Sequence, residues 1–274
     1  MPGERLEDAL PAARRLSEAG LGSVLTQLGE NVTTADEAVG VRDHYLDALE
    51  RIREAGLPSV ISVKPTQLGL DLSSDQCAAH LEALAASADA AGSTLWIDME
   101  DSSYVERTLD LYRGLKERHE RVGLALQAYL HRTPADLESL LPLRPIIRLV
   151  KGAYAEAPEI AFADKRDTDR AYTELATTLL SAAAENRAHP IFGTHDLAMI
   201  RHVIGQANRL DVPDGRYEIH MLYGIRDAEQ RRLAAEGHTV ATLISYGSAW
   251  FPWYMRRLAE RPANVWFVVR SLVS

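Results

Sequence analysis

Short apolar runs rich in β-branched residues alternate with longer amphipathic segments along the whole chain. In the long segments the apolar residues recur every three to four positions, which predicts helices, whereas the short runs predict buried strands. The eight predicted strands are Ser23–Gly29, Ser59–Pro65, Thr94–Glu100, Val122–Ala128, Pro145–Lys151, His189–His195, Tyr217–Tyr223 and Thr239–Tyr246.

Residues with capping chemistry mark several boundaries of the intervening helices. We expect helices to begin at Thr33-Thr34, Ser73-Ser74, Ser102-Ser103, Thr133-Pro134 and Asp167-Thr168, and to end at Gly56, Ala91-Gly92 and Gly237.

Strands that alternate with helices predict parallel pairing through right-handed crossovers. Eight such units favour a closed α/β barrel of the TIM type, (β/α)8, and about 250 residues is a usual length for that fold. An open, doubly wound sheet is the alternative, but no GxGxxG motif follows any predicted strand. No linker or change in composition divides the chain, so we predict one domain over residues 1–274, with an N-terminal helix within residues 1–22.

Composition narrows the classes of function. The net charge is −9 and no basic block is present, which argues against a nucleic-acid partner. Cys77 is the only cysteine, so the chain has no internal disulfide, and we expect this side chain to be a small buried hydrophobe. No apolar run is long enough to cross a membrane, and no secretory signal opens the sequence. A cytoplasmic protein is expected.

Polar and charged residues gather at the C-terminal ends of the predicted strands, where barrel enzymes carry their active sites. Arg148 is the clearest case, because a charge inside the apolar run Ile-Ile-Arg-Leu-Val is costly unless it is paired. A structural ion pair with Asp98 on a neighbouring strand is the alternative to a catalytic role. The strand-end residues are Gly29-Glu30-Asn31, Lys64, Asp98 to Asp101, Gln127, Arg148, Lys151, Thr194-His195-Asp196, His220 to Tyr223, and Tyr246.

The segment after the last predicted strand carries a second group of charges. Arg256 and Arg257 are adjacent on a predicted helix, and Glu260 follows one turn later. Two guanidinium groups about 100° apart can approach one carboxylate from different sides. An exposed helix face with an Arg256–Glu260 pair is the alternative, although aromatic residues around it favour a partly desolvated site.

These features together resemble the family of monofunctional bacterial proline dehydrogenases, from about residue 20 to the C-terminus. The matching segments follow the family order: Gly29-Glu-Asn31, Ser62-Val-Lys-Pro65, Ile97-Asp-Met-Glu100, Leu126-Gln-Ala-Tyr129, Ile147 to Tyr154, Thr194-His-Asp196, Met221-Leu-Tyr-Gly224 and Tyr254 to Glu260.

The resemblance implies a distorted barrel whose last helix lies over the barrel mouth, and FAD held without a covalent bond. It further implies oxidation of L-proline to 1-pyrroline-5-carboxylate, with electrons passed to a membrane quinone. A peripheral contact with the inner face of the membrane would accompany that acceptor.

Site residues follow from the resemblance, position by position. Arg256 and Arg257 would clamp the proline carboxylate, with Lys64 as a third cation, Asp98 orienting it, and Glu260 holding the arginines. Tyr246 and Leu222 would wall the pyrrolidine ring. On the flavin side, the resemblance assigns Met99, Gln127, Arg148 near N5, Lys151, Gly152, Ala153, Thr194 and His195.

Three departures from the family pattern are present. The first predicted strand begins only about 22 residues after Met1, where the family usually has a further helical segment. Trp253 replaces a tyrosine expected against the proline ring, which bears on tolerance for hydroxyproline, and Gly193 replaces an alanine.

Two other functions fit parts of the pattern. The barrel could be a lyase or aldolase in which Lys64 or Lys151 forms a Schiff base, or it could be a binding module without catalysis. Retention of Lys64, Arg148, Arg256 and Arg257 argues against the second. The acids from Asp98 to Asp101 lack histidines at ligand spacing, so no metal site is predicted, and His220 has no assigned role.

Overall fold

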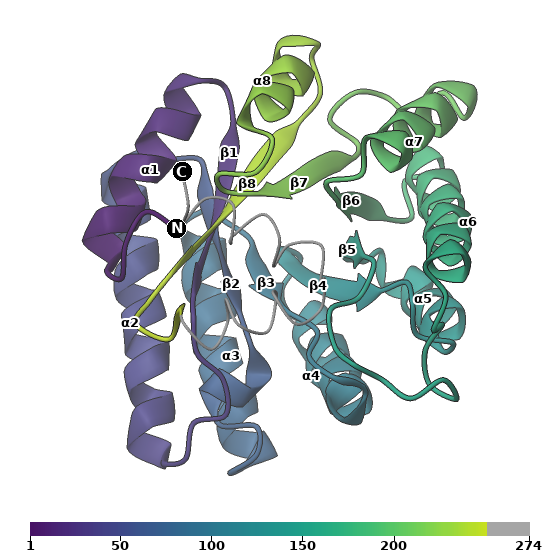
Figure 1. Cartoon of the computed structure of the whole chain (residues 1–274). Helices are drawn as coiled ribbons and strands as arrows, with labels where there is room; N and C mark the ends of the chain where they lie inside the picture. The colour runs from purple at the N-terminus through teal and green to yellow at the C-terminus, as the bar shows by residue number, and fades with distance from the viewer. Residues whose placement is uncertain (251–274) are drawn as a thin grey trace, which may run out of the picture.

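Eight parallel strands form a closed barrel inside a ring of helices in the computed structural model, which describes residues 1–250 (Figure 1). The strands follow one another in sequence order around the barrel, and β8 closes it by pairing with β1 from Gly22↔Ala241 to Gln27↔Tyr246. This confirms the (β/α)8 prediction over the open sheet. The strands are β1 (Gly22–Gln27), β2 (Ser59–Val63), β3 (Leu95–Ile97), β4 (Val122–Gln127), β5 (Ile146–Val150), β6 (His189–Gly193), β7 (Glu218–Leu222) and β8 (Val240–Tyr246).

The helices lie outside the strands and run back toward the start of each next strand (Figure 1). They are α1 (Leu6–Glu18), α2 (Ala35–Glu54), α3 (Ser74–Ala90), α4 (Val105–Lys116), α5 (Thr133–Leu140), α6 (Lys165–Ala184), α7 (Leu197–Arg209) and α8 (Asp227–Ala235), with 3-10 turns η1 (Pro65–Leu68), η2 (Ser102–Tyr104) and η3 (Leu141–Leu143). Helix α1 precedes the barrel and packs against β1 and β8. The predicted helix after β8 lies outside the described residues.

Local chemistry explains most helix boundaries. Thr34 and Glu37 form the reciprocal cap that opens α2, since the Glu37 N–H donates to Thr34 Oγ1 and the Thr34 N–H donates to Glu37 Oε2, both at 3.2 Å. The prediction for α6 was wrong by a few residues: Asp164, not Asp167, caps it by accepting a bond from the Arg166 N–H.

The barrel interior changes from apolar to polar along the strands. Its lower layer is made of Val24, Trp96, Ile191 and Ala241, all buried. Arg148 lies in the middle of β5, and its guanidinium carbon is 4.7 Å above the Trp96 ring centre. Cation–π contact of this kind stabilises a buried guanidinium. Trp96 therefore separates the packed barrel core from the polar C-terminal mouth.

The barrel is distorted where β1 and β2 meet. These strands pair from Ser23↔Ser59 to Leu25↔Ile61, and beyond this point the Tyr45 hydroxyl of α2 is bonded to both strands. It accepts from the Gln27 N–H at 2.9 Å and donates to the Ser62 carbonyl at 3.0 Å. The Tyr45 hydroxyl group therefore links the ends of β1 and β2 beyond their last paired residues.

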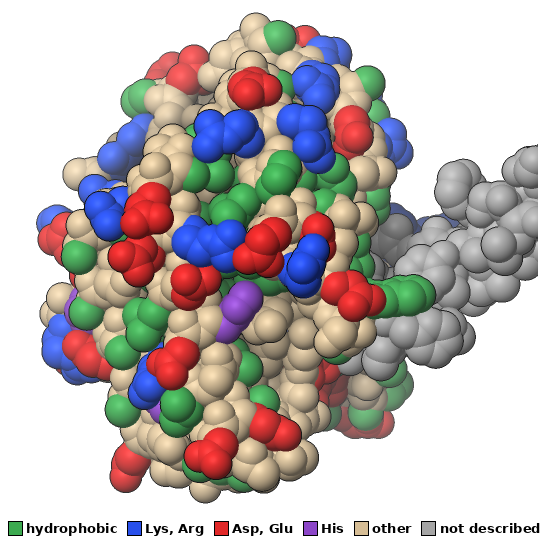
Figure 2. Space-filling view, turned by 90° about the vertical axis from the view of Figure 1, so that its left-hand side faces the viewer, with side chains coloured by type: hydrophobic (Ala, Val, Ile, Leu, Met, Phe, Trp, Pro, Cys, Tyr) green, Lys and Arg blue, Asp and Glu red, His purple; other side chains and the backbone are tan. Residues whose placement is uncertain are grey.

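The outer surface carries both signs of charge. On the face formed by α1 and α2, lysine and arginine side chains are interspersed with aspartate and glutamate (Figure 2). Between α3 and α4, His119 is held by Asp89 at 2.6 Å and Glu82 at 2.8 Å. Burial opposes charge on this imidazole, but the two carboxylates outweigh it and raise the pKa of His119. Among residues 1–250, no helix is long and apolar enough to cross a membrane.

Candidate active site

An ion pair between Arg148 and Asp98 lies at the centre of the barrel mouth. Arg148 Nη2 donates to Asp98 Oδ1 and, at 3.0 Å, to Ser62 Oγ, which itself donates to Asp98 Oδ1 at 3.0 Å. Arg148 is only 3% exposed, and burial lowers its pKa although Asp98 acts in the opposite direction. The ion pair considered from the sequence is therefore present, and it lies at the end of the barrel where catalysis is expected.

Lys64 directly follows β2, the strand that carries Ser62, and its ammonium group contacts the loop after β1. Its ammonium group lies 3.4 Å from the Gly29 carbonyl and 3.5 Å from Glu30 Oε1. Asp98, which the resemblance assigns to orient this lysine, has side-chain hydrogen bonds with Ser62 and Arg148. Ser62 lies near the end of β2, and Lys64 directly follows that strand with an extended backbone, so both side chains point toward the mouth.

Gln127 connects the loops on the other side of the mouth. Its Nε2 donates to the Glu100 carbonyl at 2.7 Å, and its Oε1 accepts from the Ala153 N–H at 3.4 Å. Met99, the residue before Glu100, is buried. The predicted flavin-side residues Gln127 and Ala153 are thus joined directly, with Glu100 as a partner that the predicted site did not include.

The loop after β5 approaches the mouth closely through Gly152. This residue has a φ of +126°, and a side-chain Cβ there would lie 2.2 Å from the Tyr129 ring. Only glycine suits both the conformation and the space. The preceding Lys151 is fixed by Asp169 at 2.6 Å and Asp196 at 3.2 Å, so its ammonium group is held against α6 and the start of α7.

Thr194 and His195 form the turn between β6 and α7. Thr194 Oγ1 accepts from the Asp196 N–H at 3.1 Å, and His195 Nε2 accepts from the Leu222 N–H at 3.2 Å. The His195 imidazole therefore presents Nε2 to the end of β7 and links this turn to the predicted substrate-wall residue Leu222.

Tyr246 lies on the helix side of β8. Its hydroxyl group is 2.8 Å from His44 Nε2 of α2, and the two ring centres are 5.7 Å apart. Side chains alternate between the two faces of a strand. The structure therefore places the Tyr246 ring against α2, and not beside Lys64 and Arg148. Arg256, Arg257, Glu260 and Trp253 lie outside the described residues.

His220, left unassigned from the sequence, faces the barrel interior. Its ring lies edge-on to Trp96 with centres 5.8 Å apart, and its Nε2 is 3.2 Å from Glu218. Glu218 also contacts His189 at 2.9 Å. His189 and Glu218 begin β6 and β7, at the opposite end of the barrel from the mouth, whereas His220 lies two residues further along β7, where burial and the charge of Arg148 lower its pKa. In the part of the chain that the structure describes, no three or more His, Cys, Asp or Glu side chains are arranged so that they could hold a metal ion.

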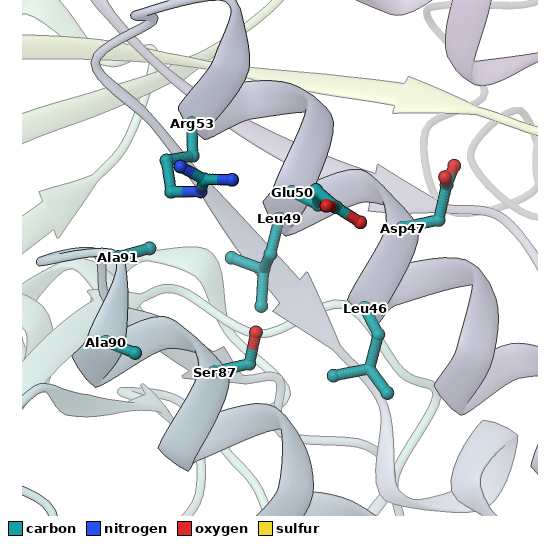
Figure 3. A pocket seen from close by; sticks show the side chains of 8 residues that line it. All are labelled: Leu46, Asp47, Leu49, Glu50, Arg53, Ser87, Ala90 and Ala91. Atoms are coloured by element: carbon teal, nitrogen blue, oxygen red, sulfur yellow. The ribbon is translucent and has the colours of Figure 1, made fainter.

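A surface groove of about 640 Å³ lies on the outside of the barrel between α2 and α3 (Figure 3). It contains none of the predicted site residues and lies apart from the strand ends. It is lined by Leu46, Asp47, Leu49, Glu50, Arg53, Ser87, Ala90 and Ala91.

Comparison with known proteins agrees with the geometry. The sequence profile described as "Proline dehydrogenase" matches residues 9–270. The chain belongs to the proline dehydrogenase family. Proline dehydrogenase 1 of Bacillus subtilis is 37% identical over 271 residues, which cover 99% of this chain and 88% of that protein. Proline dehydrogenase of Deinococcus radiodurans is 34% identical over 276 residues, with the same shares.

Solved structures of larger proteins contain the same barrel. Proline utilization A of Bdellovibrio bacteriovorus matches with a TM-score of 0.87 at 22% identity, covering 94% of this chain and 32% of that one. The Bradyrhizobium japonicum protein, as its D779Y mutant, matches with a TM-score of 0.79 at 26% identity, covering 94% and 30%. This proline dehydrogenase family member thus spans about a third of each of these proteins.

Proposed function

We propose that this protein oxidises L-proline to 1-pyrroline-5-carboxylate with non-covalently bound FAD and delivers the electrons to a membrane quinone. Membership of the proline dehydrogenase family supports the substrate and the reaction class. The observation that carries the proposal is the cluster at the barrel mouth, where Arg148, Asp98 and Ser62 are bonded together. Lys64 lies beside it, directly after the strand that carries Ser62.

The carboxylate of proline is bound by cations on two elements. Lys64 supplies one from β2, and Arg256 and Arg257 supply two more from the segment after β8, with Glu260 holding them. Planar guanidinium groups bind a carboxylate through paired hydrogen bonds and fix its orientation as well as its position. In this proposal proline displaces Glu30 from Lys64, and Leu222 contacts the apolar ring.

The residues at the mouth fit a flavin. Arg148 Nη1 is buried and has no hydrogen-bond partner among residues 1–250, so it offers a donor to an acceptor atom of a ligand. Gly152 lets the backbone of the flavin-side loop pack directly on the Tyr129 ring, which a side chain would prevent. Met99, Gln127, Arg148, Lys151, Gly152, Ala153, Thr194 and His195 would hold FAD. When bound, FAD supplies the acceptor for the hydrogen and two electrons that leave C5 of proline.

The protein contributes orientation and electrostatics to this reaction. The ring nitrogen first gives up a proton to solvent, and its lone pair then forms the C5=N double bond as a hydride leaves C5. Because the nitrogen lone pair drives this step, the site requires no base of unusual pKa. Fixing the carboxylate with several cations holds C5 in one place, which accelerates transfer by proximity. Arg148, positive and buried beside Trp96, stabilises negative charge that develops nearby.

A spectrum with and without substrate tests the proposal. We expect the purified protein to be yellow, and L-proline to bleach the flavin absorbance under anaerobic conditions without added nicotinamide. A short-chain ubiquinone should then restore the absorbance, which tests the acceptor separately. A colourless protein that gains no proline-dependent dye reduction on addition of FAD would reject the proposal. Trapping of a carbonyl substrate on Lys64 or Lys151 by borohydride would favour a Schiff-base enzyme instead.

A further inference from the structure

Glu100 is a buried acid that the proposed reaction does not use. It follows β3 and is only 3% exposed. Its carboxylate accepts two hydrogen bonds from one residue: Oε2 from the Thr66 N–H at 3.0 Å, and Oε1 from the Thr66 hydroxyl group at 2.6 Å. Two-point binding fixes the orientation of Thr66 as well as its position.

Thr66 lies two residues after Lys64, in the turn that ends β2. Because its hydroxyl hydrogen is donated to Glu100, its Oγ1 accepts the Asn31 N–H at 3.3 Å. The loop that contains Asn31 also supplies both partners of Lys64, Gly29 and Glu30. One carboxylate therefore connects the loops after β1, β2 and β3 around the ammonium group of Lys64.

The surroundings of Glu100 raise the pKa of its carboxyl group overall. Burial raises its pKa to about 7, while the Thr66 bonds and Lys64 act to lower it, and Glu30 adds to the rise. The Cys77 thiol and the Tyr104 hydroxyl group have raised pKa values, chiefly from burial, and the charge of Glu100 adds to both. A buried acid in such surroundings at a barrel mouth is typical of a functional site.

We propose that Glu100 is a positioning residue for substrate: through Thr66 it fixes the turn that directs Lys64 toward the proline carboxylate. The inference rests on the proposed function, because it needs Lys64 to bind that carboxylate. Glu100 itself touches no substrate in this scheme. Its loss should weaken proline binding while leaving the chemical step and the FAD site nearly unchanged.

Substitutions at both ends of the hydrogen-bonded pair test this proposal in the FAD-loaded enzyme. Glu100→Gln keeps the shape but places an NH2 group against one of the two Thr66 donors, and we expect KM for L-proline to rise about 10-fold, or about 1.4 kcal/mol. Thr66→Val removes the hydroxyl bond to Glu100 and the acceptor of the Asn31 N–H but keeps the backbone bond to Glu100, and it should raise KM about 3-fold. Thr66→Ser restores the hydroxyl group and should return KM to the wild-type value. The matched control is Glu117→Gln on the exposed end of α4.

Three further readouts separate positioning from a merely structural role. We expect kcat and the Kd for FAD to stay within about 2-fold of wild type, and the Kd of cyclopentanecarboxylate, a probe that lacks the amine, to rise in parallel with KM. If Glu100 acts through Thr66, the double variant should show about the same 10-fold rise as Glu100→Gln alone, and not the product of about 30-fold.

The outcomes are distinct. Unchanged KM in both single variants, multiplicative effects in the double variant, or parallel losses of FAD binding, kcat and KM would each overturn the positioning role. If Glu100→Gln does not fold, Thr66→Val and Thr66→Ser still decide the matter by the same comparison. A wild-type enzyme that L-proline does not bleach would instead reject the proposed function, and this inference with it.

Discussion

Asp98 supplies the only carboxylate bonded to Arg148 among the described residues, so Asp98→Ala leaves a buried guanidinium without its counter-charge. Breaking a buried ion pair by removing one partner costs about 3–5 kcal/mol. The Asp98 side chain is 20% exposed and Ser62 still accepts from Arg148, so we expect a loss near the lower limit, about 3 kcal/mol. Asp98→Asn keeps a carbonyl acceptor and should lose about 2 kcal/mol.

The free energy of unfolding in urea, measured without FAD and with a fixed excess of FAD, tests this prediction. Asp110→Ala is the matched control, because Asp110 pairs with Arg113 at 3.0 Å on the surface, where such pairs contribute about 0–1 kcal/mol. The two measurements distinguish stability of the fold from stabilisation by the ligand. If Asp98→Ala lost no more stability than Asp110→Ala, Arg148 would not depend on Asp98, and the description of the barrel mouth would be wrong.

Three other perturbations have expected outcomes. Gly152→Ala should destabilise the protein and weaken FAD binding at least 10-fold, because the new Cβ would overlap the Tyr129 ring. The control Gly205→Ala in α7 has open space around it and should stabilise the fold by about 0.5–1 kcal/mol. Urea unfolding and FAD titration measure these effects, and equal effects of the two substitutions would contradict the close approach of Gly152 to Tyr129. Because the pKa of His119 is raised in the folded protein, its contribution to stability is complete below pH 6.5 and is lost as the pH rises through the raised pKa. His119→Ala should remove this part of the pH dependence of the free energy of unfolding. A variant with the same pH profile as wild type would refute this role of His119. Arg256→Met should raise KM for proline far more than the Kd for FAD, and equal losses would mean that this arginine holds the cofactor or the fold.

The barrel could be predicted from the sequence because its signals are local. Each strand is a short apolar run, each helix has the 3.6-residue period, and the polar residues at strand ends are conspicuous against apolar neighbours. The pairing of Arg148 with Asp98 was also predictable, since a charge within so apolar a strand requires a partner.

Side-chain direction at strand ends was harder to predict. A shift of one residue moves a side chain to the other face of the barrel. Tyr246 is the last residue of β8, and the aromatic environment after it gave no indication that its ring would lie against His44 of α2. Only the register with β1, Gln27↔Tyr246, fixes its direction, and that register is a long-range property.

Glu100 was missed as a site residue for a related reason. In the sequence it is one of several acids after β3, where a helix start also explains acidic residues. Its partner Thr66 lies 34 residues earlier, in a turn whose geometry no local pattern defines. A Thr two residues after a strand-end Lys was the available signal, but it acquires meaning only when the barrel brings β2 and β3 together.

The most direct test of the central claim is an anaerobic titration of the FAD-loaded enzyme with L-proline, comparing wild type, Lys64→Met and the control Lys116→Met on α4. We predict that wild type and Lys116→Met are bleached at the same proline concentration, and that Lys64→Met needs at least 10-fold more proline while its Kd for FAD is unchanged. Bleaching of all three proteins at one concentration, or of none, would contradict a barrel mouth that binds the carboxylate of proline beside a flavin.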